Sequence, residues 1–360
     1  MTHTGMENAE ETNTYSQYIK RKWMALFFLA GILFLMTVLS LSMGSSRIPL
    51  SETISALFGG GEASSRIIIW NVRMPRIATA IAVGIVLAMA GCIMQNVLRN
   101  PLAAPATLGV SQGASFGAAL AIAYFNAGIQ IGTSTTHTLT ITNPYMVTFF
   151  AFLGGIATTA VILGLSRIAK VTPSVMILAG VALSALFSGA TTLVQYFADD
   201  LVVAAVVFWT FGSLGRTGWN EITLIFCLGI AAFLYFFFNR WNYNAMESGT
   251  NTAKSLGINV DTLILVSMTI AALISAVAVA FVGIINFVGL IAPHMVRKFV
   301  GNDHRFLIPC SALMGAALML GADLASRMLR APAILPIGAL TSFLGAPLFL
   351  YMIVKKGKIK

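Results

Sequence analysis

Charged residues are scarce in this 360-residue sequence. Asp, Glu, Lys and Arg make up 9% of it, against roughly 25% in soluble domains, whereas 58% of the residues are hydrophobic. This composition excludes an ordinary soluble domain and indicates a chain that crosses a membrane several times. The net charge of +10 is weak evidence for a nucleic-acid partner, because the basic residues lie in short stretches between apolar runs.

Residues suited to covalent or metal chemistry are also few. The three cysteines, Cys92, Cys227 and Cys310, lie in apolar segments without metal-ligand spacing, and the four histidines are scattered. No Walker A or H-E-x-x-H sequence occurs. The GVSQG sequence at 109–113 fits the G-x-S-x-G pattern but lacks the strand-turn-helix context of a nucleophile elbow. We therefore expect no catalytic residues, no cofactor and no metal site on this chain.

Long apolar runs dominate what is present. They do not alternate with period two, so we interpret them as helices rather than as barrel strands. The predicted fold is an all-α polytopic membrane protein with about ten transmembrane helices. A polar tail, residues 1–22, precedes a membrane domain, residues 23–360. The predicted segments are 23–43, 77–98, 105–125, 145–166, 174–197, 220–239, 261–281, 283–299, 306–330 and 334–354.

Lys and Arg are unevenly distributed between the predicted loops. With the N-terminus in the cytoplasm, fifteen of the 22 fall on the inner side and seven on the outer side. The positive-inside rule therefore predicts cytoplasmic N- and C-termini. The seven outer residues are Arg47, Arg66, Arg73, Arg76, Arg216, Arg327 and Arg330. Four of them lie between residues 47 and 76, a cluster that the topology rule does not explain.

Proline and glycine mark two places where helices are expected to break or to pack closely. We predict helix-break or gating positions at Asn100, Pro101, Pro105, Pro293 and His294. His294 is interpreted as a hydrogen-bonding residue near a helix end rather than as a ligand or proton relay. Glycines recur every four residues at 109, 113 and 117, which favours close helix packing in lipid.

Asp323 is the one acidic residue well inside an apolar run, and Arg327 follows it by four positions. The two share a helix face and are expected to pair. Ion-driven carriers usually place carboxylates or broken helices near the midplane, whereas this carboxylate has a cationic neighbour and lies toward the outer end. The chain is therefore predicted to be a conduit driven by another subunit. An ion-coupled secondary transporter is the alternative, and a membrane enzyme is a more distant one.

Residues 240–260 form the longest polar inner stretch between apolar segments. We expect a short surface helix from Thr252 to Leu256, closed by Gly257. The stretch is either a solvated linker or an element that receives motion from a cytosolic partner.

Five stretches in this order resemble the permease subunits of ABC importers for iron-siderophores, haem and cobalamin (the FecCD type). They are "RMPRIATAIAVGIVLAMAGCIMQNVLRNPLAAPATLGVSQGA", "TAKSLGINV", "NFVGLIAPHMVRKFVGNDHR", "GADLASR" and "LPIGALTSFLGAPLFL". The resemblance runs from about Arg73 to the C-terminus. It departs from the family pattern at Ala104 and Ile334, where family members often carry an acidic residue.

The resemblance implies ten transmembrane helices in an inner-membrane subunit that pairs with a second permease, and we expect an identical copy that makes a homodimer. It also implies two cytosolic ATP-binding subunits that carry ATP and Mg²⁺, and an extracytoplasmic substrate-binding protein. Arginines at the positions of Arg73, Arg76 and Arg327 would face outward and meet acidic residues of the binding protein; lipid headgroups are their alternative partners. The coupling helix that contacts the ATPase would comprise Ala253, Lys254, Ser255, Leu256 and Gly257.

Overall fold

The computed structural model describes residues 3–44, 48–125, 129–131, 139–141, 143–169, 173–331 and 333–357. Most of the loop predicted at 126–144, together with Arg47, lies outside the described residues.

Seven helices in the described part of the chain are long and apolar enough to cross a membrane. Twenty residues of α-helix cover about 30 Å, the thickness of the hydrocarbon core. The seven helices confirm an integral multi-pass membrane protein. They are α1 (His3–Ser42), α4 (Met74–Val97), α6 (Pro144–Ala169), α7 (Pro173–Tyr196), α9 (Trp219–Phe238), α12 (Val260–Val282) and α14 (His304–Met328).

Three further helices fall on the remaining predicted segments and are not among these seven. They are α5 (Val110–Tyr124), α13 (Val288–Val300) and α15 (Ile337–Gly357). Each of the ten predicted segments thus contains a helix, while the number of crossings stays a prediction. The polar residues from His3 to Lys22, predicted as a tail, are helical and continue into the apolar part of α1.

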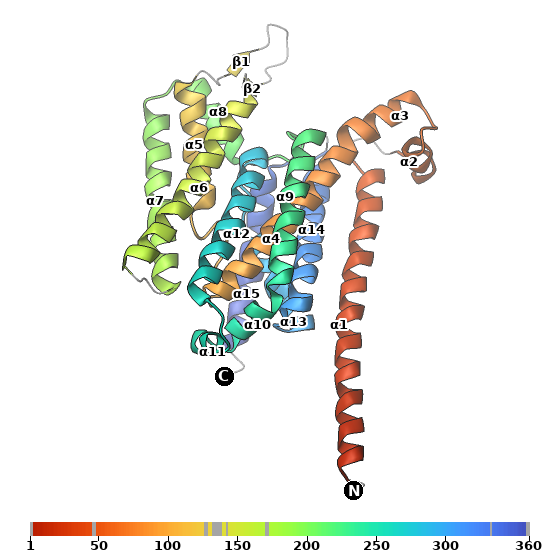
Figure 1. Cartoon of the computed structure of the whole chain (residues 1–360). Coiled ribbons are helices and arrows are strands. Elements are labelled where there is room, and N and C mark those ends of the chain that lie inside the picture. Colours follow the sequence, from red (N-terminus) through yellow and green to blue (C-terminus); the bar gives the residue numbers. More distant parts are fainter. Residues whose placement is uncertain are drawn as a thin grey trace.

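Several short elements were not predicted. They are α2 (Leu50–Leu57), α3 (Ala63–Ile68), the π-helical turn η1 (Ile69–Arg73), α8 (Asp200–Thr210), α10 (Arg240–Glu247) and α11 (Thr250–Ser255). Two three-residue strands, β1 (Ile129–Ile131) and β2 (Leu139–Ile141), form an antiparallel pair. Figure 1 shows α10, α11 and both chain ends at one end of the bundle, with α2, α3 and the strands at the other. We call these the α10 end and the α2 end.

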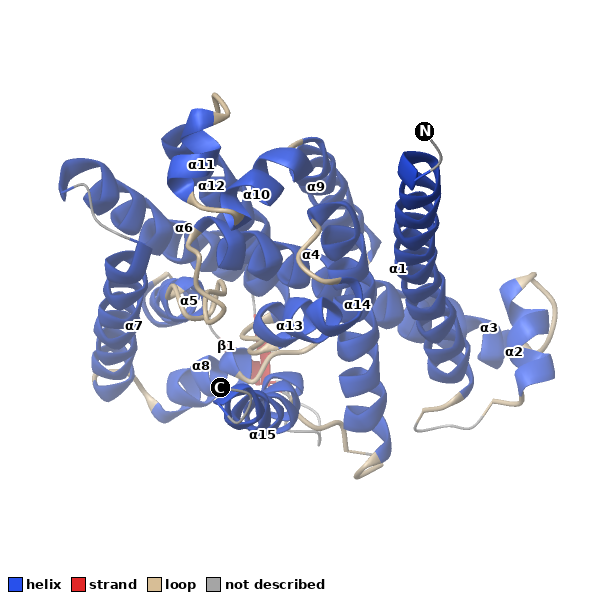
Figure 2. Cartoon of the chain, turned by 90° about the horizontal axis from the view of Figure 1, so that it is seen from below, coloured by secondary structure: helices blue, strands red, loops and turns tan. Residues whose placement is uncertain are grey.

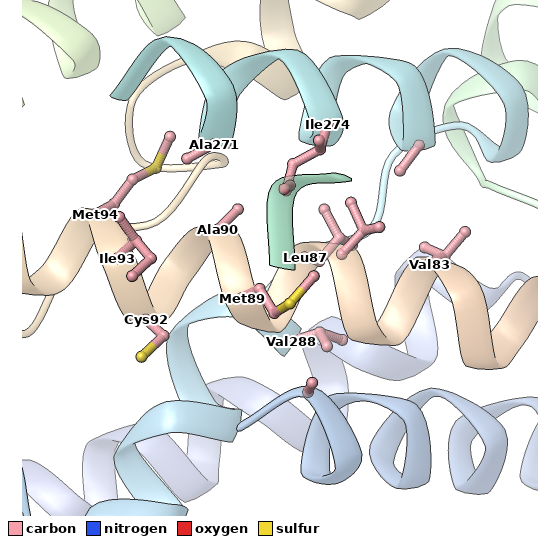
Figure 3. Close-up of a cluster of buried hydrophobic side chains, with 14 of the residues drawn as sticks. Val83, Leu87, Met89, Ala90, Cys92, Ile93, Met94, Ala271, Ile274 and Val288 are labelled. Carbon is pink, nitrogen blue, oxygen red and sulfur yellow. The ribbon is translucent and has the colours of Figure 1, made fainter. Parts of the chain in front are cut away.

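Helix α4 forms the centre of the core, and nearly all of its residues from Pro75 to Val97 are buried. It packs against α14, α12, α13 and α9. Figure 2, a view along the bundle, shows α1 on one side of these helices and α7 on the opposite side. Figure 3 shows Leu87 and Met94 of α4 in the same apolar cluster as Ile274 of α12 and Val288 of α13.

Glycines allow this helix to approach its neighbours closely. A Cβ atom placed on Gly91 would lie 1.8 Å from the carbonyl oxygen of Gly289 in α13, and one on Gly84 would lie 2.4 Å from that of Gly315 in α14. Real Cβ atoms do not tolerate such contacts, so the backbones touch only because both side chains are absent. Small residues are typical of such contacts in membranes, where packing rather than the hydrophobic effect holds helices together.

The predicted glycine row on α5 packs in the same way. A Cβ on Gly113 would lie 2.3 Å from the carbonyl oxygen of Gly154 in α6, and one on Gly117 would lie 2.0 Å from that of Phe150. The interpretation of these glycines as packing positions is therefore confirmed.

Candidate functional site

The predicted docking arginines meet at the α2 end of the bundle. Arg73 and Arg76 lie where the helix running from Ala63 to Val97 passes from η1 into α4, and Arg327 lies in the last turn of α14. The structure thus brings Arg327 together with two arginines that are about 250 positions away in sequence. We call Arg73, Arg76, Arg327 and Asp323 the arginine cluster.

Asp323 lies at the centre of this cluster and is completely buried. The Nε atom of Arg76 donates to its Oδ1 at 2.6 Å, and Nε of Arg327 lies 2.9 Å from its Oδ2. The second contact confirms the pair predicted from the spacing of Asp323 and Arg327. The first joins residues 247 positions apart in sequence and could not be predicted from spacing.

Nη2 of Arg76 also donates to the Ser326 hydroxyl of α14 at 3.4 Å, whereas Arg73 and Arg327 donate to the C-terminal end of α1. Nη1 of Arg73 donates to the carbonyl oxygens of Leu41 and Ser42. Nη1 of Arg327 donates to the carbonyl oxygens of Ser40 and Met43, and its Nη2 donates to the Ser40 hydroxyl. The last carbonyls of a helix lack intrahelical partners and carry partial negative charge. The two arginines therefore cap α1 and fix its end against α4 and α14.

Burial of the arginines differs from what the resemblance implied. All three arginines are buried: Arg73 is 4% exposed, and Arg76 and Arg327 are each 8% exposed. Their side chains therefore contact groups of this chain. Burying a charge is tolerable only when it is paired and hydrogen-bonded, and Asp323 with the carbonyls of α1 meets that need. The cluster has three positive charges and one negative charge, which leaves a formal excess of two. A role in docking stays a prediction.

The predicted coupling residues lie at the α10 end, in a well-defined turn of surface helix. α11 spans Thr250–Ser255, and Gly257 has a φ of +83°, which confirms the short helix closed by Gly257. Ala253, within α11, is buried. Lys254, Ser255 and Leu256 are exposed, and Leu256, an apolar residue at 66% exposure, is free to contact another protein.

A polar network connects α10 to three membrane helices. Asp303, just before α14, accepts hydrogen bonds from Lys22 of α1 at 3.2 Å, Asn244 of α10 at 3.1 Å and Arg305 of α14 at 2.8 Å. Burial alone would raise the pKa of this carboxyl group, but the hydrogen bonds from Arg305, Asn244 and Lys22 outweigh it and hold the pKa below its usual value.

The same network reaches α4 through Glu247, the last residue of α10. Its carboxylate accepts from Nδ2 of Asn96 at 3.0 Å and from Nδ2 of Asn302. Motion of α10 would therefore be transmitted to α1, α4 and α14 together. None of these contacts was predicted from the sequence, because their partners come from separate segments.

The helix-break predictions were right at one place and wrong at the other. α4 ends at Val97 and α5 begins only at Val110, so Asn100, Pro101 and Pro105 lie in a genuine break, and the third segment starts five residues later than predicted. Pro293 and His294, by contrast, lie inside an uninterrupted α13. The break there lies upstream, at 283–287, where Phe287 adopts a φ of +66°.

The absence of a break at Pro293 has a packing explanation. Proline has no N–H, so the carbonyl four residues earlier, that of Gly289, receives no helical hydrogen bond from it. That carbonyl is the atom that packs against Gly91 of α4. The carbonyl that Pro293 leaves unpaired therefore faces a glycine of α4, and α13 continues through the proline.

Metal chemistry finds no support in the described part of the chain. No group of three or more His, Cys, Asp or Glu residues within it could hold a metal ion.

Comparisons with known proteins agree over nearly the whole chain. The model of the FecCD transport family matches residues 32–355. An ABC transporter permease protein of Methanocaldococcus jannaschii is 50% identical over 96% of this chain and 98% of its own length. The hemin transport system permease protein HmuU of Yersinia pestis is 35% identical over 91% of this chain and 95% of its own.

A solved structure supports the same relationship at the level of the fold. A metal-chelate type ABC transporter in an inward-facing conformation superposes with a TM-score of 0.77 and 31% sequence identity, covering 93% of this chain and 99% of that one.

Proposed function

We propose that this chain, which belongs to the FecCD transport family, moves an iron-siderophore, haem or cobalamin-type chelate across the membrane. It is a permease subunit of an ABC importer, and the family match over residues 32–355 carries that assignment. The hemin and metal-chelate relatives support this class of cargo. An ion-coupled carrier is not favoured, because the charge of the buried Asp323 is already balanced by ion pairs with two arginines.

The proposed assembly contains two permease subunits, two cytosolic ATP-binding subunits and an extracytoplasmic binding protein. ATP and Mg²⁺ are bound by the ATPase subunits, and this chain contributes no cofactor. In the proposed topology ten helices cross the cytoplasmic membrane and both termini are cytoplasmic. That topology is supported by the position of both chain ends at the α10 end of the bundle (Figure 1).

We assign docking of the binding protein to the arginine cluster. Guanidinium groups form oriented pairs with carboxylates, and a formal excess of two positive charges attracts an acidic surface. Because Arg73 and Arg327 are engaged by carbonyls of α1, an incoming carboxylate would compete with those carbonyls. Docking would thereby loosen the end of α1, which gives the binding protein a way to act on the helices.

We assign contact with the ATPase to α11 and Gly257. The exposed Lys254, Ser255 and Leu256 form the contact surface. Movement of this surface would pass through α10 to Asp303 and Glu247, and from them to α1, α4 and α14. Helix α1 is thus bonded to the proposed sites of both partners, through Lys22 near its middle and through the carbonyls at its C-terminal end, which suits a mechanism of alternating access.

Reconstituted transport tests the proposed function. The chain would be placed in liposomes with its ATPase and binding protein, and uptake of ferric hydroxamate, haemin and cobalamin would be measured. We expect uptake of one of these to require ATP, to stop with vanadate and to be indifferent to an uncoupler. Accumulation by the chain alone, driven by an ion gradient, would overturn the proposal.

A docking measurement tests the role of the cluster separately. Arg73→Gln should weaken binding of the binding protein by at least about tenfold, equivalent to about 1.4 kcal/mol. Arg305→Gln, at the α10 end of α14, is the control and should leave the affinity unchanged. Equal affinities for both variants and the unmodified chain would remove the arginine cluster from docking.

A further inference from the structure

The short helix α2 has an exposed apolar stripe that nothing in the described chain covers. Leu50, Ile54 and Phe58 recur every four residues along α2 and its C-cap and are 48%, 49% and 88% exposed. Positions four apart lie on one face of a helix. Three aligned apolar side chains on the outside of an eight-residue helix call for a partner.

The rest of α2 is divided between a packed face and a polar face. Thr53 and Ala56 are buried within the protein, while Ser51 and Ser55 are exposed. At 100° per residue, the apolar stripe lies between these two faces. Three faces of this kind are typical of a helix that lies in a membrane–water interface, with protein on one side, lipid on another and water on the third.

The place of α2 in the chain fixes its height relative to the membrane. It lies between the end of one membrane-length helix, Ser42, and the start of the next, Ala63. Figure 1 shows α2 level with the end of α1 and beside it, outside the helical bundle. Five residues separate Leu57 from Ala63, a connection of at most about 20 Å. The helix is therefore held close to the boundary of the bilayer.

The hairpin formed by α2 and α3 is held firmly, so the stripe is not a loose loop that happens to be exposed. Ser65 donates to the Glu52 carboxylate at 2.5 Å, and the indole N–H of Trp70 donates to the Ala56 carbonyl at 3.2 Å. Trp70 is itself 42% exposed, and a partly exposed tryptophan with its N–H satisfied is typical of the interfacial aromatic belt.

We propose that α2 is an interfacial helix whose Leu50, Ile54 and Phe58 insert into the lipid headgroup region at the α2 end of the bundle. The occupant of this face is membrane lipid, because α2 begins eight residues after the end of the membrane-length helix α1 and lies beside that end, outside the helical bundle (Figure 1). The polar face, with Ser51 and Ser55, meets water.

This anchoring has a consequence for the arginine cluster. The connection from α1 to α2 begins at the carbonyls of Ser40 to Met43, which Arg73 and Arg327 bind. A lipid-anchored α2 therefore fixes the depth of α1's end, and with it the depth of the cluster, relative to the membrane surface.

Site-directed spin labelling tests the proposal on the full chain in lipid nanodiscs. The background variant is Cys227→Ser, because Cys227 is exposed whereas Cys92 and Cys310 are buried. Nitroxide labels would be attached to Ile54→Cys and Phe58→Cys on the stripe, and to Ser51→Cys and Ser55→Cys on the polar face as matched controls. Collision rates with oxygen, which partitions into lipid, would be compared with those of a water-soluble nickel chelate.

We expect the ratio of oxygen to nickel collisions to be several-fold higher at positions 54 and 58 than at 51 and 55. Equal ratios at all four positions would overturn the proposal, since the stripe would then face water. Labels at 54 and 58 that neither reagent reaches would also overturn it, and would indicate a covering protein or a second copy of the chain. The measurement does not depend on transport, so its outcome is separate from that of the proposed function.

Discussion

Removal of the Asp323 carboxylate is the sharpest test of the arginine cluster. Asp323→Ala would leave Arg76 and Arg327 buried without the charge that both contact, at 2.6 and 2.9 Å. Breaking a buried ion pair by removing one partner costs about 3–5 kcal/mol. Asp323→Asn is the matched control: it keeps the size of the side chain and an acceptor oxygen, so we expect a smaller loss.

The chain provides its own reporter for this loss of stability. Cys92 and Cys310 are buried and Cys227 is exposed, so in a Cys227→Ser background a thiol-reactive fluorophore reports unfolding on heating. A loss of 1 kcal/mol lowers the melting temperature of larger domains by about 2 °C. Asp323→Ala should therefore melt about 6–10 °C lower than the background protein, on the same scale.

A double-mutant cycle separates the ion pair from general damage to α14. Asp323→Ala combined with Arg76→Ala should cost less than the sum of the single changes, with a coupling of about 1–3 kcal/mol. Asp323→Ala combined with Arg305→Ala should be additive, because eighteen residues of helix separate the two positions by about 27 Å. An unchanged melting temperature for Asp323→Ala, or equal coupling in both cycles, would refute the reasoning.

Three further outcomes are expected. Gly91→Ala should prevent close packing of α4 on α13, because the added Cβ would lie 1.8 Å from the Gly289 carbonyl oxygen. The yield of folded protein in size-exclusion chromatography should therefore collapse, whereas the control Gly164→Ala, which has open space around it, should behave as the unmodified chain. Gly257→Val forces a β-branched residue to a φ of +83°, which costs about 1–2 kcal/mol, and should reduce transport per ATP hydrolysed in proteoliposomes; an unchanged ratio would remove this turn from coupling. The hydrogen bonds to Asp303 lower its pKa in the folded chain, so the stability that they contribute is present above the unfolded pKa of about 3.9 and is lost as the pH falls from there through the lower folded pKa. Asp303→Asn should therefore lower the melting temperature at neutral pH and make it less dependent on acid. Parallel acid profiles for the two proteins would contradict this.

Local pattern was sufficient to predict the helices and several of their details. Apolar runs long enough to span a bilayer predicted the ten segments, because a backbone in lipid must satisfy its own hydrogen bonds. Glycine spacing predicted the packing of Gly113 and Gly117, and the i,i+4 rule predicted the pair of Asp323 and Arg327. Each of these depends on residues within a few turns of one helix.

Amphipathic and broken elements were harder to predict. α2 and α8 have eight and eleven residues, too few for a hydropathy window of membrane length. Pro293 was expected to interrupt α13, and it does not; the carbonyl that it leaves unpaired, that of Gly289, packs against Gly91 on another helix. A local rule for proline cannot include that contact.

What the sequence determined by itself is a multi-pass helical permease of a recognisable family, since hydrophobic length, charge distribution and five ordered motifs are all local properties. Only the tertiary structure decided what the outer arginines contact. Their partners are a carboxylate and the carbonyl oxygens of α1 from far along the chain, and a hydrogen bond between distant segments is fixed by how helices pack, which no spacing within one segment records.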